Sequence, residues 1–198
     1  MPRLLSSLST LLVLGLGSPT TAPAAVGAGL LAAGLAMAPA SARAAGDVAP
    51  GFTLKNLNPR ATGYDVVDLG ELRGKVVLLN FWATWCGPCK LEMPHLQDIY
   101  SDLGDQGLVV VSVSIDDARD KSQIKPVIMS KRLSFPVVHD QDTSVVNQYN
   151  PTKTLPFTVL IDRDGRIAQV HQGYNPGDES TLRAEVEALL SQPATPGD

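Results

Sequence analysis

Cysteine is scarce in this sequence, which contains only Cys86 and Cys89 in 198 residues. A structural zinc site usually needs four ligands, with a second Cys or His pair at similar spacing. The three histidines, His95, His139 and His171, are scattered and form no such pair. A disulfide that closes so short a loop adds little stability by the loop-entropy account. The cysteines therefore indicate neither a structural zinc site nor a structural bridge, and we expect no metal.

Basic clusters are also missing. From residue 46 onward the chain carries 14 basic and 20 acidic side chains. Proteins that bind nucleic acid usually present a basic patch, so no nucleic-acid partner is expected. The chain shows no internal repeat, and its length after residue 45 suits one domain. We therefore expect a single domain over residues 46–192, followed by a polar tail over 193–198.

Charged side chains are absent from residues 4–42. Arg3 precedes this apolar stretch, and Ala42-Arg43-Ala44 follows it, a layout typical of a secretory signal peptide. The alternative is an uncleaved membrane anchor, although the second apolar piece, 24–38, is shorter than the roughly 20 residues that span a bilayer. Residues 1–45 are thus predicted to be a signal peptide or an N-terminal anchor that tethers the protein. Either would place the cysteines in an extracytoplasmic space, periplasmic or facing the periplasm.

Hydrophobic periodicity predicts an α/β domain. Strands are expected at 52–57 and 64–69 as an N-terminal hairpin, and at 75–82, 108–115, 136–139, 157–161 and 166–172. Helices are expected at 86–103, with a kink at Pro94, at 116–133, broken or kinked at Pro126, at 144–149 and at 178–190. This order predicts a mixed central sheet with helices on both faces.

The pair Cys86 and Cys89 lies where an apolar strand gives way to a helix. The unpaired N–H groups of a helix N-terminus favour a thiolate, which is the nucleophile in disulfide exchange. We expect Cys86 to be the exposed attacking sulfur and Cys89, one turn further, to resolve the mixed disulfide. Pro88 suits the first helical turn, and Gly87 would let a substrate backbone approach. The pattern therefore predicts a redox-active dithiol that needs no other cofactor.

Several nearby residues allow two interpretations. Glu92, three residues after Cys89, is either a buried carboxyl that exchanges a proton with that thiol or a solvated charge. Trp85 either contacts the substrate chain or packs in an ordinary way. Pro156 either follows a cis peptide bond or simply begins a strand. His95 is out of phase with the cysteines on the helix and is expected on the surface.

Two segments resemble the TlpA/ResA group of extracytoplasmic thioredoxin-like proteins. These are the stretch from Asn80 to Pro94, NFWATWCGPCKLEMP, and the stretch from Leu155 to Gly165, LPFTVLIDRDG. The resemblance implies a thioredoxin-like fold with a central insertion, which residues 116–150 would supply. It also implies that Pro156 is a cis-proline facing the disulfide, that Leu155 is the backbone partner of the substrate, and that Glu92 is a functional acid. Asn80 stands where cytosolic thioredoxins carry a buried aspartate, which favours Glu92 as its replacement.

The same resemblance implies a thiol-disulfide oxidoreductase. Its substrates would be disulfides of exported proteins, such as apocytochromes c, and its electrons would come from a membrane-embedded thiol donor. A thiol peroxidase of the same superfamily is an alternative, but Ala83 stands where those enzymes place Thr or Ser. A copper-binding chaperone that uses Cys86, Cys89 and one histidine is a second alternative.

Overall fold

The computed structural model describes residues 45–193. The predicted signal peptide or anchor over 1–45 and the polar tail over 193–198 therefore lie, apart from their inner end residues, outside the described part of the chain. Within residues 45–193, none of the helices combines the length and the apolar character needed to cross a bilayer.

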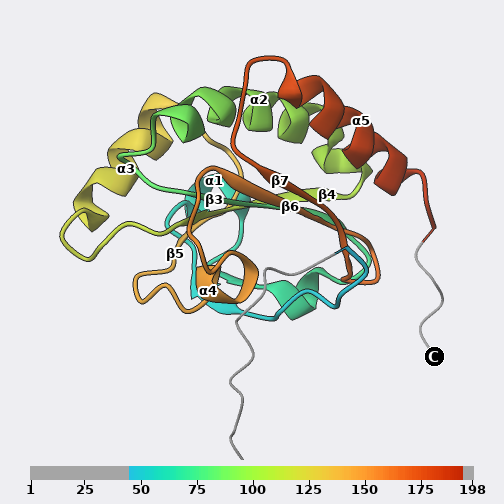
Figure 1. The fold of residues 1–198 in the computed structure, drawn as a ribbon, viewed down its shortest axis with the longest axis horizontal. Helices are drawn as coiled ribbons and strands as arrows, with labels where there is room; N and C mark the ends of the chain where they lie inside the picture. The colour runs from blue at the N-terminus through green and yellow to red at the C-terminus, as the bar shows by residue number, and fades with distance from the viewer. Residues whose placement is uncertain (1–44, 194–198) are drawn as a thin grey trace, which may run out of the picture. The chain divides into compact units, whose positions relative to one another are not determined.

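Residues 45–193 contain a five-stranded mixed sheet and a separate two-stranded hairpin. The strands are β1 (Thr53–Lys55), β2 (Val66–Asp68), β3 (Val76–Trp82), β4 (Leu108–Ser114), β5 (Val137–His139), β6 (Phe157–Ile161) and β7 (Ile167–Gln172). The order across the large sheet is β5-β4-β3-β6-β7 (Figure 1). β3, β4 and β5 run parallel, whereas β6 and β7 pair antiparallel. Every residue of β3 and β4 is buried, as their largely apolar sequences, VVLLNFW and LVVVSVS, predict.

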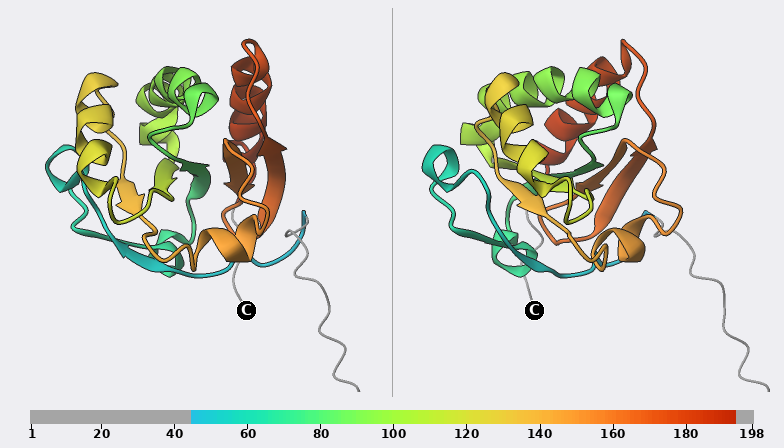
Figure 2. Two further views of the ribbon diagram at one scale, coloured as in Figure 1. Left: turned by 60° about the vertical axis from the view of Figure 1, so that its left-hand side comes forward. Right: turned by 90° about the vertical axis from the view of Figure 1, so that its left-hand side faces the viewer.

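The helices cover both faces of this sheet. They are α1 (Pro59–Thr62), α2 (Gly87–Leu103), α3 (Lys121–Ser130), α4 (Val146–Tyr149) and α5 (Asp178–Leu190), with 3-10 turns η1 (Leu69–Leu72) and η2 (Gly104–Gln106). α2, α3 and α5 lie side by side over one face, and α4 lies against the other (Figure 2). The crossover connections β3-α2-β4 and β4-α3-β5 have the same handedness, and both lead toward the same edge of the sheet. Their helices therefore lie on the same face. The predicted mixed sheet, hairpin and central insertion are confirmed.

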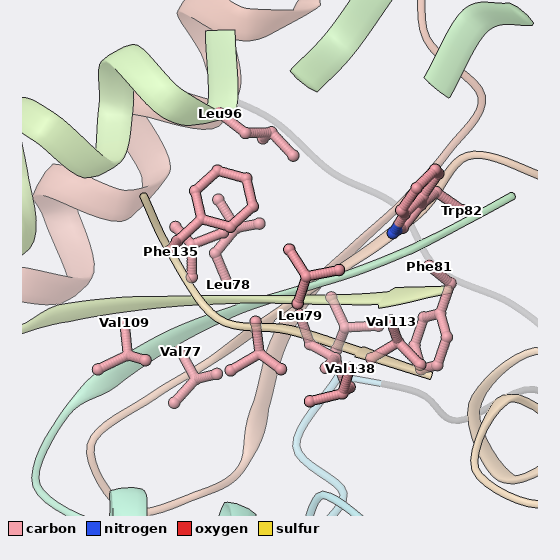
Figure 3. Close-up of a cluster of buried hydrophobic side chains, with 14 of the residues drawn as sticks. Val77, Leu78, Leu79, Phe81, Trp82, Leu96, Val109, Val113, Phe135 and Val138 are labelled. Atoms are coloured by element: carbon pink, nitrogen blue, oxygen red, sulfur yellow. The ribbon is translucent and has the colours of Figure 1, made fainter. Parts of the chain in front are cut away.

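Alternation along β3 divides the core into two halves. Leu78 lies on the same side of the sheet as Leu96 of α2 (Figure 3). Phe81 points to the opposite side, where its ring centroid lies 5.5 Å from that of Tyr149 in α4. Successive side chains of a strand alternate between faces. Asn80, two residues from Leu78, therefore belongs to the face that α2 and α5 cover, beneath the predicted dithiol helix.

The helix predicted over 116–133 begins later than expected. α3 starts at Lys121 and continues through Pro126 as one helix, so of the two expected outcomes at Pro126, a break or a kink, the break is wrong. The side chain of Asp116 accepts hydrogen bonds from Thr84 and holds this residue at the strand end, outside the helix. Leu91, which helical spacing places with the apolar residues of α2, is 60% exposed because only the other face of that helix packs on the sheet.

Candidate active site

Cys86 is the N-cap residue of α2. It follows the short loop that leaves β3, and a disulfide joins it to Cys89 in the first turn of the helix. The backbone N–H of Cys89 donates to Sγ of Cys86 at 3.2 Å. A side chain at the N-cap normally accepts this hydrogen bond, and a negative charge there is favoured by the helix dipole. In a reduced pair, the same position would favour a thiolate at Cys86.

The two sulfurs are less accessible than the sequence suggested. Cys86, which we expected to be exposed, retains only 5% of its surface, and Cys89 retains 1%. The N-cap geometry turns Cys86 toward its helix, so the exposed surface is supplied by Trp85, which is 64% exposed, and by Gly87 and Pro88. A Cβ built on Gly87 would meet no atom within 4 Å. A substrate backbone therefore has open space beside the disulfide.

Asp116 anchors the loop that carries the cysteines, and the sequence analysis missed it. Its carboxylate accepts hydrogen bonds from the backbone N–H of Thr84 at 3.0 Å and from Thr84 Oγ1 at 2.6 Å. Ser114 Oγ donates to it as well, at 2.7 Å. The signal that could have found it is an acidic residue placed directly after a buried parallel strand, at the edge where ligands bind in open α/β sheets.

Glu92 is a buried carboxyl, which confirms one of its two predicted environments. It is 5% exposed and accepts hydrogen bonds from Asn80 Nδ2 at 2.9 Å and from Thr158 Oγ1 at 3.4 Å. Asn80 and Thr158 are direct partners across β3 and β6, and Asn80 Nδ2 also donates to Thr158 Oγ1 at 2.9 Å. Burial raises the pKa of Glu92 to about 7, although both hydrogen bonds act in the opposite direction. A carboxyl in this state can take up and release a proton near neutral pH.

The peptide bond between Leu155 and Pro156 is cis, as the resemblance implied. Pro156 immediately precedes β6, whose first residue pairs antiparallel with Phe81. Continuing this register places Pro156 opposite Trp82, at the edge of the sheet from which the cysteine loop emerges. Pro156 itself is buried and Leu155 is half-buried. The structure thus brings Pro156 and the loop that carries the cysteines to the same edge of the sheet.

A cavity of about 170 Å³ adjoins Glu92 between α2, β7 and α5. It is lined by Glu92, His95, Leu96, His171, Gln172, Gly173, Tyr174, Asp178, Glu179 and Leu182. His95, which we expected on the surface, is half-buried and lines this cavity one helical turn after Glu92. Helical phase alone predicted a surface position, but α5 packs beside this part of α2 and leaves His95 only partly exposed.

A larger groove of about 490 Å³ lies on the other side of α2, between this helix and α3. Thr84, Trp85 and Lys90 form one wall, and residues of α3, including Pro126 and Val127, form the other. The predicted insertion therefore contributes directly to the surroundings of the cysteine loop. In residues 45–193, no group of three or more His, Cys, Asp or Glu side chains is arranged to hold a metal ion.

A mixed sheet of this order, with a disulfide at the start of its central helix and a cis-proline at the same edge, defines a thioredoxin-like protein. Residues 45–170 match the model of the AhpC/TSA family. The thiol-disulfide oxidoreductase ResA of Oceanobacillus iheyensis is 40% identical over 128 residues, which make up 65% of this chain and 65% of that protein. The match thus spans just under two thirds of that relative.

Other relatives agree. ResA of Geobacillus kaustophilus is 37% identical over 133 residues, 67% of this chain and 72% of that protein. The solved thioredoxin domain of a thiol-disulfide oxidoreductase from Bacteroides vulgatus superposes with a TM-score of 0.63 at 28% identity, covering 76% of this chain and 100% of that one. The chain belongs to the AhpC/TSA family, among the thiol-disulfide oxidoreductases of the ResA type.

Proposed function

We propose that this protein is an extracytoplasmic thiol-disulfide oxidoreductase that reduces disulfides of exported proteins, such as apocytochromes c. The observation that carries the proposal is the Cys86–Cys89 disulfide at the N-terminus of α2, one turn from the buried carboxyl of Glu92. The uncharged segment over 4–42 supports export or a membrane tether. A membrane-embedded thiol donor would return the pair to its reduced state.

The first step is attack on the substrate disulfide. The thiolate of Cys86, stabilised by the N–H groups of the first turn of α2, forms a bond to one substrate sulfur. The substrate S–S bond breaks, and the other substrate sulfur leaves as a thiolate that takes a proton from solvent. The product is a mixed disulfide between Cys86 and the substrate.

The second step needs a base for Cys89. This thiol is 1% exposed and lies three residues before Glu92 on the same helix. In its ionised form Glu92 takes the proton of Cys89, and the new thiolate attacks the sulfur of Cys86. The bond between Cys86 and the substrate breaks, the second substrate sulfur leaves as a thiolate that takes a proton from solvent, and two electrons have passed to the substrate. The protein is left with the Cys86–Cys89 disulfide and no further cofactor is required.

The substrate chain docks beside the disulfide at surfaces that the structure leaves open. Trp85 supplies an exposed flat apolar face, and the groove between it and α3 can receive an extended segment. Gly87 and Pro88 are exposed on the approach to Cys86. The half-buried Leu155 lies at the same edge and offers its backbone to the substrate.

The proposal is tested by following disulfide reduction with the purified domain, using insulin and a disulfide-bonded apocytochrome c peptide. Cys86→Ser is expected to abolish reduction, whereas Cys89→Ser is expected to accumulate a mixed disulfide that mass spectrometry detects. Full activity of Cys86→Ser would refute the mechanism. The reduction potential of the pair, measured against glutathione, tests the direction: a potential near −120 mV would indicate an oxidant, and one near −270 mV a reductant, two values about 7 kcal/mol apart.

A further inference from the structure

We propose that the cavity between α2, β7 and α5 is the route by which Glu92 exchanges its proton with solvent while a substrate covers the cysteines. His95 and Asp178 would be positioning residues for this exchange. The inference rests on the proposed function, because it concerns the proton that Cys89 releases during resolution of the mixed disulfide.

The hydrogen-bonded side of Glu92 offers no exit. Its two partners, Asn80 and Thr158, belong to neighbouring strands of the sheet and are 1% exposed each. An amide does not titrate, and the hydroxyl of Thr158 is itself buried against Asn80. A proton taken up by Glu92 therefore has no titratable acceptor in that direction.

The front of the site offers no exit during the reaction either. Without a partner, only 5% of the surface of Cys86 and 1% of that of Cys89 is in contact with water. A polypeptide bound through a mixed disulfide to Cys86 would cover Trp85 and Pro88, which make up the exposed surface there. Water would then be excluded from the side on which the sulfurs react.

The cavity behind Glu92 provides the missing path. Its volume of about 170 Å³ exceeds by about tenfold the 10–15 Å³ that one water molecule requires. Titratable side chains face it from each surrounding element: His95 from α2, His171 from β7, Tyr174 from the following loop, and Asp178 and Glu179 from α5. A polar chamber of this size has room for water molecules that can pass a proton from the carboxyl to the surface.

Three of these groups, His171, Tyr174 and Glu179, are already hydrogen-bonded, and Asp178 accepts a hydrogen bond from the backbone N–H of Asn175 at 2.8 Å. His171 Nε2 lies 2.6 Å from Glu185 Oε2, and the hydroxyl of Tyr174 donates to Glu179 at 2.9 Å. His95 lies one turn after Glu92 with its ring centroid 6.0 Å from that of Tyr174, so it can accept a proton that crosses the chamber. Asp178 opposes ionisation of Glu92 through its negative charge, so it promotes proton uptake.

The experiment measures the resolution step alone. Reduced protein is mixed in a stopped-flow instrument with 5,5′-dithiobis(2-nitrobenzoate), whose second thionitrobenzoate is released when Cys89 attacks Cys86. A parallel reaction uses insulin, with the lifetime of the mixed disulfide followed by acid quenching and mass spectrometry. The small reagent leaves the front of the site open to water, whereas insulin covers it.

His95→Leu is expected to slow resolution of the insulin mixed disulfide about tenfold at pH 7, and resolution of the small mixed disulfide less than twofold. His95→Gln, which is polar but cannot titrate, serves as a second variant and should behave in the same way. Equal rates for wild type and both variants with insulin, or equal slowing with both reagents, would overturn the proposal. His95 is half-buried at the cavity wall, and melting curves verify that the variants fold.

Asp178→Asn is expected to move the acidic midpoint of the pH–rate profile down by about half a pH unit, because Glu92 then ionises more readily. Asp98→Asn makes the same charge change on an exposed position of α2 outside the cavity and is the matched control. Identical profiles for the two variants would contradict the role of Asp178. Failure of the wild-type protein to form any mixed disulfide with insulin would instead refute the proposed function, and the small-reagent profiles would still test the role of Asp178.

Discussion

Glu92→Gln is the substitution that most directly tests the environment of the active site. Glutamine preserves the shape of the side chain. Its carbonyl oxygen can accept the hydrogen bond from Asn80, and its amide NH2 can donate to the hydroxyl of Thr158 in place of the bond that Thr158 donates to the carboxylate. Apart from that one hydrogen bond, it removes the ability to ionise. Comparing the variant with wild type therefore measures how much an ionised carboxylate at this buried position destabilises the folded protein.

The magnitude follows from the pKa of Glu92, which burial raises from 4.5 to about 7. Below about pH 4.5 the carboxyl is protonated in both the folded and the unfolded chain and costs nothing. Between the two pKa values the unfolded chain has lost the proton that the folded protein keeps, so stability falls by about 1.4 kcal/mol per pH unit. Above about pH 7 both states are ionised, and the accumulated loss is about 3 kcal/mol.

The assay is urea denaturation of the oxidised protein at closely spaced pH values from 4 to 8.5. The free energy of unfolding of Glu92→Gln minus that of wild type should rise by about 3 kcal/mol across this range, with most of the change between pH 4.5 and 7. Glu187→Gln is the matched control, because it neutralises a carboxyl of α5 whose side chain is 52% exposed. A difference for Glu92→Gln that stays constant with pH would show that this carboxyl is not desolvated and would refute the reasoning.

Three further changes test the surroundings of the disulfide. Asp116→Asn should lower the free energy of unfolding by about 1–3 kcal/mol, because the hydrogen bonds from Thr84 to a buried carboxylate are weakened. Asp117→Asn, at an exposed neighbouring position, should leave the free energy of unfolding unchanged, and chemical denaturation of both variants measures the difference. Trp85→Ala should raise KM for a polypeptide disulfide severalfold while the melting temperature stays the same, since the side chain is 64% exposed; an unchanged KM would rule out substrate contact. Asn80→Asp places a second carboxyl beside Glu92, and its urea midpoint should fall more steeply than that of wild type between pH 6 and 8, whereas parallel curves would contradict the coupling.

Much of the fold could be predicted because it depends on local patterns. The buried runs in β3 and β4, the turn between β6 and β7 and the amphipathic α5 all appear where periodicity placed them. The start of α3 could not be predicted in this way. Helical spacing continues back to Asp116, but hydrogen bonds from Thr84, 32 residues earlier, and from Ser114 hold that residue at the strand end, outside the helix.

By itself the sequence determined the chemistry: two cysteines, separated by Gly87 and Pro88 at the transition from an apolar strand to a helix, form a dithiol pair through contacts within one helical turn. The tertiary structure decided what surrounds that pair. Whether Glu92 is solvated or buried depends on Thr158, 66 residues away, which the antiparallel register of β3 and β6 places beside Asn80. Whether His95 faces solvent or a cavity depends on the docking of α5. Such contacts between distant segments follow from strand register and helix packing, which no spacing within a single element specifies.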